Sequence, residues 1–498
     1  MVRGRKSVSL VGLGPHARRI YYPMLARAAA AGEVDIPLLI ELEDQRQTVE
    51  SYLATHSVQP TRIVYVPTAE RDSESLPQTA LQALEEARRD GLWGMIVATE
   101  PRAHRVYSLW ALENAVHVLL DKPVTARSLV DDPASGSLGL VDDFYDLLDA
   151  SERTGARCLV QTQRRAHLGY ELIHSYLREF LGAYGVPVTY LDLYHADGMW
   201  NMPDEFFSRE NHSYKYGYGK LMHSGYHFFD LMTWLLGVND SLRATAPDRF
   251  EFSTRSHTPA DFLRQVGPDQ YRRFFGEQGA SLTRFDPDAL RQLSRFGETD
   301  LHLLGQFRRG EAAMTTVSMN LLQTSFSRRA WMELPADTYK SNGRVRHERM
   351  TIQVGHLLNI QVHSYQSYES GKHADSDAGL GHYDHFDVYF FRNSAVVGGK
   401  PFDRLEVGEA LARGSAPDSG YLGHNEAARS ELFNDFLNAD SGRAGLASHE
   451  LPVKLAASTY WNMLVAGPGR STSIDLNAKR TGWLTVDGAD VDTSGGSR

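Results

Sequence analysis

The chain has 498 residues but only one cysteine, Cys158, and no surplus of basic residues. A single thiol cannot form an internal disulfide, so a fold stapled by disulfides is excluded. Cys158 lies in the apolar run 156–160, which predicts a small buried hydrophobic residue rather than a reactive thiol. The balance of 52 basic against 62 acidic residues gives a net charge of −10, whose field repels nucleic acid and anionic lipid. We therefore expect no nucleic-acid partner.

Long hydrophobic runs are also missing from the chain. No stretch reaches the roughly 18 continuous apolar residues that a membrane helix requires, so we expect no membrane association. The segment Met1–Lys6 is too short for a signal peptide and merges with the apolar run Val8–Val11, so we expect a cytoplasmic protein. A chain of 498 residues, 42% hydrophobic and 23% charged, has an ordinary globular composition and is too long for one compact core.

Short apolar runs alternate with helical patterns over residues 1–163, which predicts a parallel sheet covered by helices. We expect a Rossmann domain here. Pro23 should interrupt the helical segment 17–31, and the Gly, Ser and Pro residues of 133–139 should form a loop. The predicted strands are 8–11, 36–42, 63–66, 95–98, 116–120 and 157–161.

The pattern changes beyond residue 164, and residues 164–498 predict a second domain of the α+β class. Helical patterns at 169–181 and 225–236 are accompanied by runs that alternate apolar and polar residues. Such alternation is typical of a mainly antiparallel sheet with one covered face. The predicted strands are 188–193, 301–307, 312–319, 350–354 and 360–365.

Turns and insertions divide this second domain. Arg309, Gly310 and Glu311 predict a hairpin turn between two of the strands. The segment 241–298 is polar with scattered turn signals, and we expect it to be a helical insertion. A second insertion is expected near 372–424.

A glycine-rich turn follows the first predicted strand. Residues 11–17 read V-G-L-G-P-H-A, which matches G-x-G-x-x-A between a strand and a helix. Gly12 would permit the tight turn, Gly14 would let the backbone approach a diphosphate, and Ala17 would let the helix pack closely on the strand. The helix begins at Pro15 and His16, where its dipole favours phosphate. Alone, the pattern also fits a purely structural turn.

An acidic stretch ends the second predicted strand, about 25 residues further along, which is the usual spacing. Glu41, or else Glu43, would accept both ribose hydroxyls of NAD and repel the 2′-phosphate of NADP. Arg46 lies close enough in sequence to reach that phosphate instead. The two features together predict a nicotinamide dinucleotide cofactor, with NAD preferred to NADP.

Two further segments, 97–104 (V-A-T-E-P-R-A-H) and 117–123 (H-V-L-L-D-K-P), are separated by a predicted helix. They resemble the glucose–fructose oxidoreductase/inositol dehydrogenase (Gfo/Idh/MocA) family, whose members carry A-T-P-x-x-x-H and then H-V-L-x-E-K-P. Here Glu100 is an extra residue and Asp121 replaces the family's Glu. The resemblance implies a cofactor site that includes Thr99, Pro101, His104, Asp121 and Lys122.

A segment of the second domain, 217–237, resembles the family motif G-G-x-L-x-D-x-G-x-H-x-x-D…W-L-x-G. One departure matters, since His223 stands where the family usually has Asp. The resemblance implies that His227 is the acid/base, and that the open sheet forms a subunit interface in a homo-oligomer. It also implies a small-molecule substrate bound by Arg165, Tyr218, His223 and Asp230.

The proposed catalytic residues are Lys122, His227 and His223. Lys122 precedes a proline at a strand end, and its cation would stabilise charge that develops on a substrate alkoxide. His227 would move the proton, because an imidazole titrates near neutral pH. His223, His227 and Asp230 share a face if this segment is helical. The Asp-to-His change puts alcohol oxidation in doubt and favours a keto or imine substrate.

Metal binding is the weaker interpretation of the histidines. His223 and His227 have the spacing of a zinc motif, but the glutamate of H-E-x-x-H is missing. A second group of His and Asp residues lies in a Gly- and Ser-containing stretch and fits a solvated loop better. This group is His373, Asp375, Asp377, His382, Asp384 and His385. We expect no metal.

The sequence therefore predicts an NAD(P)-dependent oxidoreductase that transfers hydride between nicotinamide and a sugar, a cyclitol or a related keto or imine compound. Two alternatives stay open. One is a glycosidase that retains NAD for transient oxidation, and the other is a non-catalytic sensor that binds dinucleotide.

Overall fold

The computed structural model describes residues 4–280, 285–333, 343–367, 384–408, 424–467 and 469–493. The chain forms two compact units. The first unit consists of Met1–Arg127, Gly139–His167 and Asn425–Val453, and the second of Ser128–Leu138, Leu168–His424 and Lys454–Arg498. The return of 425–453 to the first unit differs from the sequence analysis, which placed this segment in the second domain.

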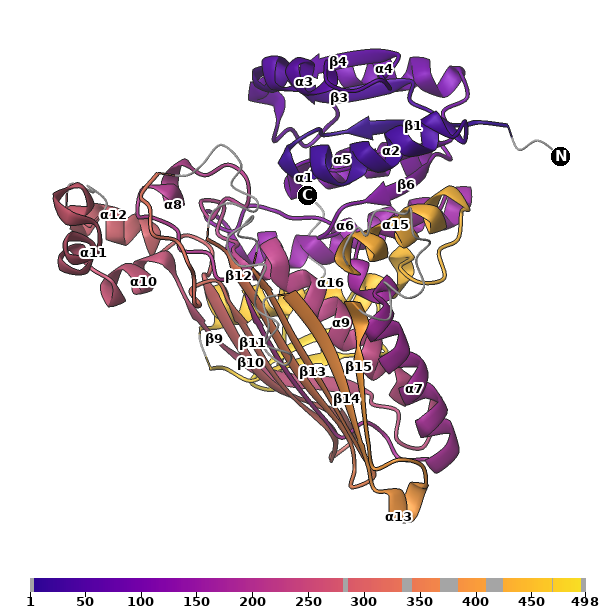
Figure 1. Cartoon of the computed structure of the whole chain (residues 1–498), viewed down its shortest axis with the longest axis vertical. Helices are drawn as coiled ribbons and strands as arrows, with labels where there is room; N and C mark the ends of the chain where they lie inside the picture. Colours follow the sequence, from indigo (N-terminus) through magenta and orange to yellow (C-terminus); the bar gives the residue numbers. More distant parts are fainter. Residues whose placement is uncertain are drawn as a thin grey trace. The chain divides into compact units, whose positions relative to one another are not determined.

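Within the described residues, the first unit contains a parallel sheet of seven strands (Figure 1). Its order is β4-β3-β1-β5-β6-β7, with β2 also pairing with β1, which is the strand order of a Rossmann fold. The predicted Rossmann domain is confirmed. The strands are β1 (Lys6–Val11), β2 (Val34–Asp35), β3 (Leu38–Leu42), β4 (Arg62–Val66), β5 (Gly94–Val97), β6 (His117–Leu120) and β7 (Cys158–Val160).

Helices cover this sheet and bury the apolar strands on both faces, as a parallel sheet requires. The central strand β5 is buried along its whole length, and so is Cys158, whose pKa burial raises to about 12. The helices are α1 (Pro15–Arg19), α2 (Tyr21–Ala30), α3 (Arg46–Leu53), α4 (Gln78–Arg89), α5 (His104–Glu113) and α6 (Pro133–Thr154).

Helix α15 (His424–Leu437) completes the core of the first unit although it lies late in the chain. Its Phe433 and Phe436 are buried in the same cluster as the side chains of β1 and β3. A Cβ on Gly94 would lie 2.8 Å from the Phe436 ring, so the glycine lets this helix approach β5. The short turn Leu446–His449 and α16 (Glu450–Trp461) follow it.

Two local features predicted within residues 1–163 need correction or refinement. The helical segment after β1 breaks at Ile20, and Pro23 lies in the first turn of α2, where its missing N–H is tolerated. The predicted loop at 133–139 is wrong, because α6 begins at Pro133. Asp132 caps this helix by accepting the Ser135 N–H at 3.0 Å.

The second unit contains a sheet of eleven strands within the described residues (Figure 1). Its order is β15-β14-β13-β12-β8-β11-β10-β9-β16-β17-β18, and every neighbouring pair is antiparallel except β8 and β11. The large mainly antiparallel sheet is confirmed. The strands are β8 (Tyr190–Ala196), β9 (Arg249–His257), β10 (Asp300–Arg309), β11 (Ala312–Leu322), β12 (Val345–Val354), β13 (Leu358–Ser367), β14 (Asp384–Arg392), β15 (Phe402–Glu406), β16 (Thr472–Asp475), β17 (Leu484–Val486) and β18 (Ala489–Asp490).

Helices α7 (Leu168–Tyr184) and α9 (Tyr226–Leu236) pack on one face of this sheet (Figure 1). Tyr170 of α7 contacts Phe386 of β14, and Phe228 of α9 stacks on His195 of β8. The predicted hairpin at Gly310 joins β10 to β11, and Gly310 has the positive φ of 52° that such a turn favours. None of the helices in the described residues is long and apolar enough to cross a bilayer.

The first predicted insertion, 241–298, is helical in part. It also contributes β9 to the sheet, which the sequence analysis did not anticipate. Much of the second, 372–424, lies outside the described residues, and its residues 384–408 supply β14 and β15. The short helices of the second unit are α8 (Glu205–Ser208), α10 (Pro259–Gln265), α11 (Pro268–Ala280), α12 (Pro287–Leu293) and α13 (Ser394–Val397).

A close backbone crossing positions the segment that carries His223 and His227. A Cβ on Gly297 would collide with the carbonyl of Tyr218, and a Cβ on Gly219 would collide with the carbonyl of Glu298. Lys220 donates its backbone N–H to the Glu298 carbonyl at 2.7 Å. The glycines thus fix where the next turn, Leu221–Gly225, begins.

Candidate functional site

The glycine turn of the first unit has the geometry that the sequence predicts. Gly12 has φ 89°, and a Cβ there would lie 2.6 Å from the Ala98 carbonyl oxygen, so only glycine fits. Gly14 caps α1, and a Cβ on it would meet no atom within 4 Å. Ala17 is buried against the sheet. The turn therefore leaves open space beside Gly14, as a diphosphate would need.

Glu41 lies at the carboxyl end of β3 and faces this turn. One carboxylate oxygen accepts the Leu13 N–H at 2.6 Å, and the other accepts the Leu42 N–H at 2.8 Å. Burial raises the pKa of Glu41, while the two backbone amides oppose that rise. Each oxygen of a carboxylate retains a further lone pair, so Glu41 can accept two more hydrogen bonds.

The cation nearest in sequence to this acid is already engaged. Arg46 forms two 2.9 Å hydrogen bonds with the Glu43 carboxylate, and its guanidinium lies 3.9 Å from the centre of the Tyr65 ring. Glu50 lies 3.7 Å from the same guanidinium. Glu43, the second acid predicted to bind ribose, thus serves as a partner for Arg46.

The segments after β5 and β6 lie at the same edge of the sheet, since carboxyl ends of parallel strands coincide. Pro101 opens a short turn after Thr99, which is partly buried. His104 is fully buried, and its ring nitrogens lie 2.9 Å from the Pro123 carbonyl and 3.3 Å from the Thr99 carbonyl. The histidine therefore connects the two segments. The Lys122–Pro123 peptide is cis.

Asp121 is held by three neighbours at the end of β6. It accepts hydrogen bonds from the Tyr21 hydroxyl at 2.9 Å and from the Lys122 amide at 3.0 Å, and His16 lies 4.0 Å away. Burial would raise the pKa of Asp121, but His16 and Lys122 hold it below its usual value. Burial lowers the pKa of His16 to about 4, so His16 is neutral at pH 7.

Sequence reasoning missed Arg429 of α15, whose charge helps to lower the pKa of His16. Arg165, the predicted substrate contact, is buried and donates to the Ser448 hydroxyl at 2.7 Å and to the Arg443 carbonyl at 3.0 Å. In the structure it therefore anchors the 443–448 segment inside the first unit, and a substrate role stays a prediction.

In the second unit, one turn of π-helix spans Leu221–Gly225 and leads directly into α9. Such turns are frequent at functional sites. The turn changes the angular spacing that a regular α-helix would give to His223 and His227. Both histidines are 7% exposed, and Asp230 is fully buried.

His223 faces a group of ring side chains. Its Nε2 lies 3.2 Å from the Ser213 carbonyl oxygen, and its ring lies 4.8 Å from the Tyr214 ring and 5.0 Å from the His212 ring. Tyr218, the predicted substrate contact, is buried with its ring 6.2 Å from that of His223. The structure thus brings His223 and Tyr218 together.

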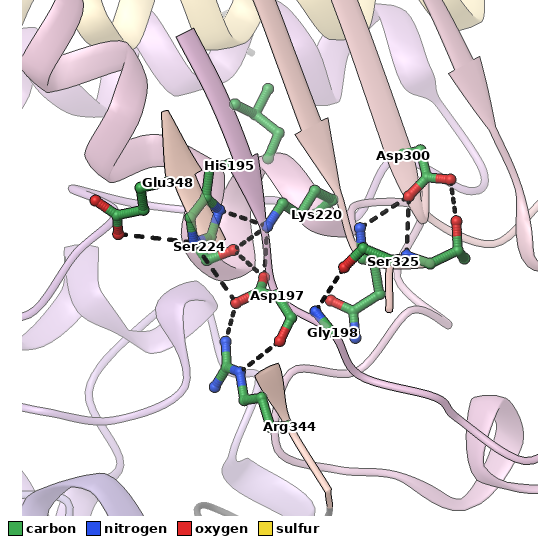
Figure 2. A network of polar contacts seen from close by, with 12 residues as sticks. His195, Asp197, Gly198, Lys220, Ser224, Asp300, Ser325, Arg344 and Glu348 are labelled. Atoms are coloured by element: carbon green, nitrogen blue, oxygen red, sulfur yellow. Dashed lines mark hydrogen bonds and ion pairs between the residues drawn. The ribbon is translucent and has the colours of Figure 1, made fainter. Parts of the chain in front are cut away.

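A buried polar network joins the π-helical turn to the sheet (Figure 2). The Lys220 ammonium is 0% exposed and donates to Asp197 at 2.5 Å, to Ser224 at 2.9 Å and to His195 Nδ1 at 2.9 Å. These three bonds use all three ammonium donors. Ser224 donates in turn to Asp197 at 2.5 Å, and Arg344 forms an ion pair with the same carboxylate.

The pKa values of the charged groups in this network are shifted in the directions that burial and ion pairing require. Burial would raise the pKa of Asp197, but Arg344 and Lys220 hold it well below its usual value. Burial lowers the pKa of Lys220 to about 8, against the opposing effect of Asp197. At pH 7 the network therefore consists of one carboxylate shared by two cations.

A second buried carboxyl group, that of Glu298, contacts the first residue of the π-helical turn. It accepts the Leu221 N–H at 2.7 Å and the Tyr460 hydroxyl at 3.2 Å, while its Oε2 atom has no hydrogen-bond partner in the described part of the chain. Burial raises the pKa of Glu298 to about 7. No cation pairs with it among the described residues, which explains why its neutral form is favoured.

Metal ligation finds no support in the described ranges. No group of three His, Cys, Asp or Glu residues there could hold a metal ion. The second predicted group of His and Asp residues includes His385, on β14. Its Nε2 lies 2.8 Å from Nδ1 of His363, on the neighbouring strand β13. The members from 373 to 382 lie outside the described residues.

The fold is that of oxidoreductases with an N-terminal Rossmann domain and a large antiparallel sheet. No protein-family profile and no curated protein matches the chain. Solved structures do match over 95% of it. One is aldose–aldose oxidoreductase from Caulobacter crescentus complexed with glycerol, at 12% identity over 100% of that chain and a TM-score of 0.54.

Two further solved structures carry a dinucleotide. An oxidoreductase from Agrobacterium radiobacter in complex with NAD+, L-tartaric acid and magnesium matches at 11% identity over 98% of its chain, with a TM-score of 0.53. An inositol dehydrogenase homolog from Azotobacter vinelandii complexed with NAD+ matches at 15% identity over 100% of its chain, with a TM-score of 0.54. At these identities the likeness establishes the shared fold.

Removing the shared carboxylate should destabilise the second unit. We expect Asp197→Asn to lower the free energy of unfolding by about 3–5 kcal/mol, because it leaves two buried cations without a counter-charge. Asp192→Asn, at a partly exposed position on β8, should change it by about 0.5 kcal/mol or less. Urea unfolding followed by circular dichroism measures both. Equal effects of the two substitutions would contradict this role of Asp197.

Glu298 should make stability fall as the pH rises. Its pKa of about 7 in the folded protein exceeds the 4.5 of an ordinary glutamate, so its contribution is fully present below pH 4.5 and is lost as the pH rises through 7. We expect a loss of about 3 kcal/mol from this group between pH 4.5 and 8. Glu298→Gln should remove that part of the pH dependence in unfolding measurements.

The fully exposed Glu311, in the β10–β11 hairpin, provides the control for this prediction. Glu311→Gln should leave the pH dependence of unfolding as it is in the native chain. A Glu298→Gln protein whose stability varies with pH as before would show that Glu298 is ionised throughout.

Proposed function

We propose that the chain is an NAD-dependent oxidoreductase of the Gfo/Idh/MocA family that acts on a small polar metabolite. The observation that carries the proposal is the convergence of four segments at one edge of the parallel sheet. The Gly12–Gly14 turn follows β1, Glu41 ends β3, Thr99 follows β5 and Lys122 follows β6. Ligands of open α/β sheets bind at this edge.

The residues fit a dinucleotide. The open space beside Gly14 admits a diphosphate, and the free lone pairs of the Glu41 carboxylate can accept the two hydroxyls of a ribose. A 2′-phosphate would meet the Glu41 charge, and the nearby Arg46 is neutralised by Glu43. NAD is therefore favoured over NADP.

When bound, nicotinamide supplies the acceptor or donor of a hydride. The chain supplies charge and proton transfer. Lys122 directs its cation toward the oxygen or nitrogen that gains negative charge during the reaction, and Asp121 fixes the Lys122 backbone by accepting its amide. His227 gives or takes the proton, and its neighbour His223 assists in binding the substrate. The substrate class is a sugar, a cyclitol or a related keto or imine compound.

The cofactor preference can be tested on Glu41. We expect Glu41→Gln to weaken NAD+ binding about tenfold to a hundredfold, because hydrogen bonds to a charged acceptor contribute about 1.5–3 kcal/mol. The ratio of NAD+ to NADP+ affinity should fall as well. Isothermal titration with both cofactors measures these changes. Glu43→Gln, at an exposed position two residues on, should leave the NAD+ affinity unchanged.

Binding of NADP+ more tightly than NAD+ by the unchanged protein would contradict the assignment of Glu41. If neither NAD+ nor NADP+ binds, the proposed function as a whole is contradicted.

The acid/base role can be tested on His227. A screen of sugars and cyclitols with NAD+ or NADH, followed through the absorbance of the reduced cofactor, identifies a substrate. With it, His227→Gln should lower kcat by about 10²–10⁴ and remove one limb of the pH profile, while NAD+ affinity stays unchanged. Lys122→Met should lower kcat by about 10²–10³.

His356→Gln, at an exposed position in the β12–β13 hairpin, should keep full activity. A protein that retains NAD through purification but shows no net change of reduced cofactor with any substrate would point instead to a glycosidase with transient oxidation.

A further inference from the structure

Three histidines lie on three neighbouring strands of the second unit's sheet. They are His347 on β12, His363 on β13 and His385 on β14 (Figure 1). Nε2 of His347 lies 3.3 Å from Nε2 of His363, and Nδ1 of His363 lies 2.8 Å from Nε2 of His385. Each ring nitrogen of His363 thus contacts a nitrogen of another imidazole. We call these three residues the histidine row.

The pairing register places the histidine row on the face of the sheet that points away from α7. His385 precedes Phe386, whose ring contacts Tyr170 of α7, and successive side chains of a strand point to opposite faces. The two outer histidines pair with Tyr365 of β13 from its two sides. His363, two residues earlier on β13, shares the face of Tyr365.

The titratable and charged side chains around the histidine row come from five neighbouring strands. They are Tyr194 of β8, Glu348 and Arg349 of β12, Tyr365 of β13, Asp387 of β14, and Arg404 and Glu406 of β15.

Two of these charged groups pair with His363 in the register, Arg349 from β12 and Asp387 from β14. The Asp387 carboxylate is fully buried, and its Oδ1 lies 2.9 Å from Nε and 2.8 Å from Nη2 of Arg404. Its Oδ2 lies 4.0 Å from Nε2 of His385. Because a guanidinium already balances this carboxylate, it compensates protons added to the histidine row only in part.

The hydrogen-bonding pattern limits how many protons the histidine row can hold. A neutral imidazole has one donor and one acceptor nitrogen, so three neutral rings can supply one donor and one acceptor to each of the two contacts. One added proton is also accommodated, since a cationic His363 can donate to both outer rings. A second added proton always leaves two donors facing each other across one contact. The same proton gives the row two positive charges within a few ångströms.

The pKa values agree with this limit. Burial lowers the pKa of His347 to about 4, and the neighbouring His363 adds to the effect. Burial and His385 lower the pKa of His363, against the opposing effect of Asp387. Histidine in an unfolded chain titrates near pH 6.5, at about the usual value. The two groups therefore stabilise the fold fully above pH 6.5, and this stabilisation is lost as the pH falls toward 4.

We propose that the histidine row is an acid-sensitive switch, which holds strands β12, β13 and β14 together near neutral pH and opens this end of the sheet in mild acid. The position suits local opening, because within the described residues only β15 follows β14 at this end of the sheet, and it pairs with β14 over five residues. Clusters of histidine that gain protons near pH 5–6 drive such changes in other pH sensors.

Hydrogen–deuterium exchange on the full chain, followed by mass spectrometry at pH 7.5 and pH 5, measures this opening. After correction for the intrinsic exchange rate, the protection of β13 and β14 peptides should be about tenfold lower at pH 5, allowing for the partial exposure of His347 and His363. Peptides from β10 and β11, at a distance from the histidine row in the strand order, provide an internal control. Their protection should change by less than about threefold.

His363→Gln removes the middle ring, so that neither imidazole–imidazole contact remains. In this variant the protection of β13 and β14 should change by less than about threefold between the two pH values. His347→Gln removes one contact and should show an intermediate change, which keeps the proposal testable if His363→Gln does not fold. His356→Gln, at an exposed position in the β12–β13 hairpin, should show the full change of the native chain.

The proposal is overturned if the native chain loses no protection in β13 and β14 at pH 5. It is also overturned if the loss is as large in His363→Gln and His347→Gln as in the native chain, because other groups would then be responsible. Neither NAD+ nor a substrate enters the measurement, so these outcomes leave the proposed function standing.

Discussion

The second unit depends on one buried carboxylate. Asp197 directly follows β8. It receives hydrogen bonds or ion pairs from Lys220 just before the π-helical turn, from Ser224 within that turn and from Arg344 just before β12. Residue 197, residues 220–224 and residue 344 belong to three separate segments of the chain, and the Asp197 side chain connects them. A charge inside a protein is tolerated only when it is paired. The fold must therefore bring Asp197 and its two cations together, and the stability of the fold depends on that pairing. The histidines that follow Lys220 take their positions from this arrangement.

The first unit shows how much of a fold local sequence patterns can predict. All six strands predicted there were found, since each is a short apolar run bounded by polar residues and a parallel strand is buried on both faces. The return of α15 was not predicted. Its Phe433 and Phe436 pack against strands more than 300 residues earlier, and nothing in the helix itself says which core it joins. The helical start of α6 was missed because Gly136 and Gly139 weaken the helical pattern.

The candidate site divides in the same way. The Gly12–Gly14 turn and Glu41 were predictable, because the chemistry of a dinucleotide requires fixed residue types at fixed distances along one strand–turn–helix unit. The pair formed by Lys220 and Asp197 was not predictable. A lysine and an aspartate 23 residues apart form no recognisable sequence pattern, and the pair becomes informative only when the structure shows both side chains buried and hydrogen-bonded to each other.

Position 223 connects these arguments. In the family that the chain resembles, an aspartate would stand there, close to the rings of His212 and Tyr214. Asp197 balances Lys220 and Arg344 from its place directly after β8. A histidine cannot bring to position 223 the negative charge that an aspartate would carry there. The departure from the family pattern, which at the sequence level casts doubt on alcohol oxidation, therefore changes the charge beside the buried rings of His212 and Tyr214.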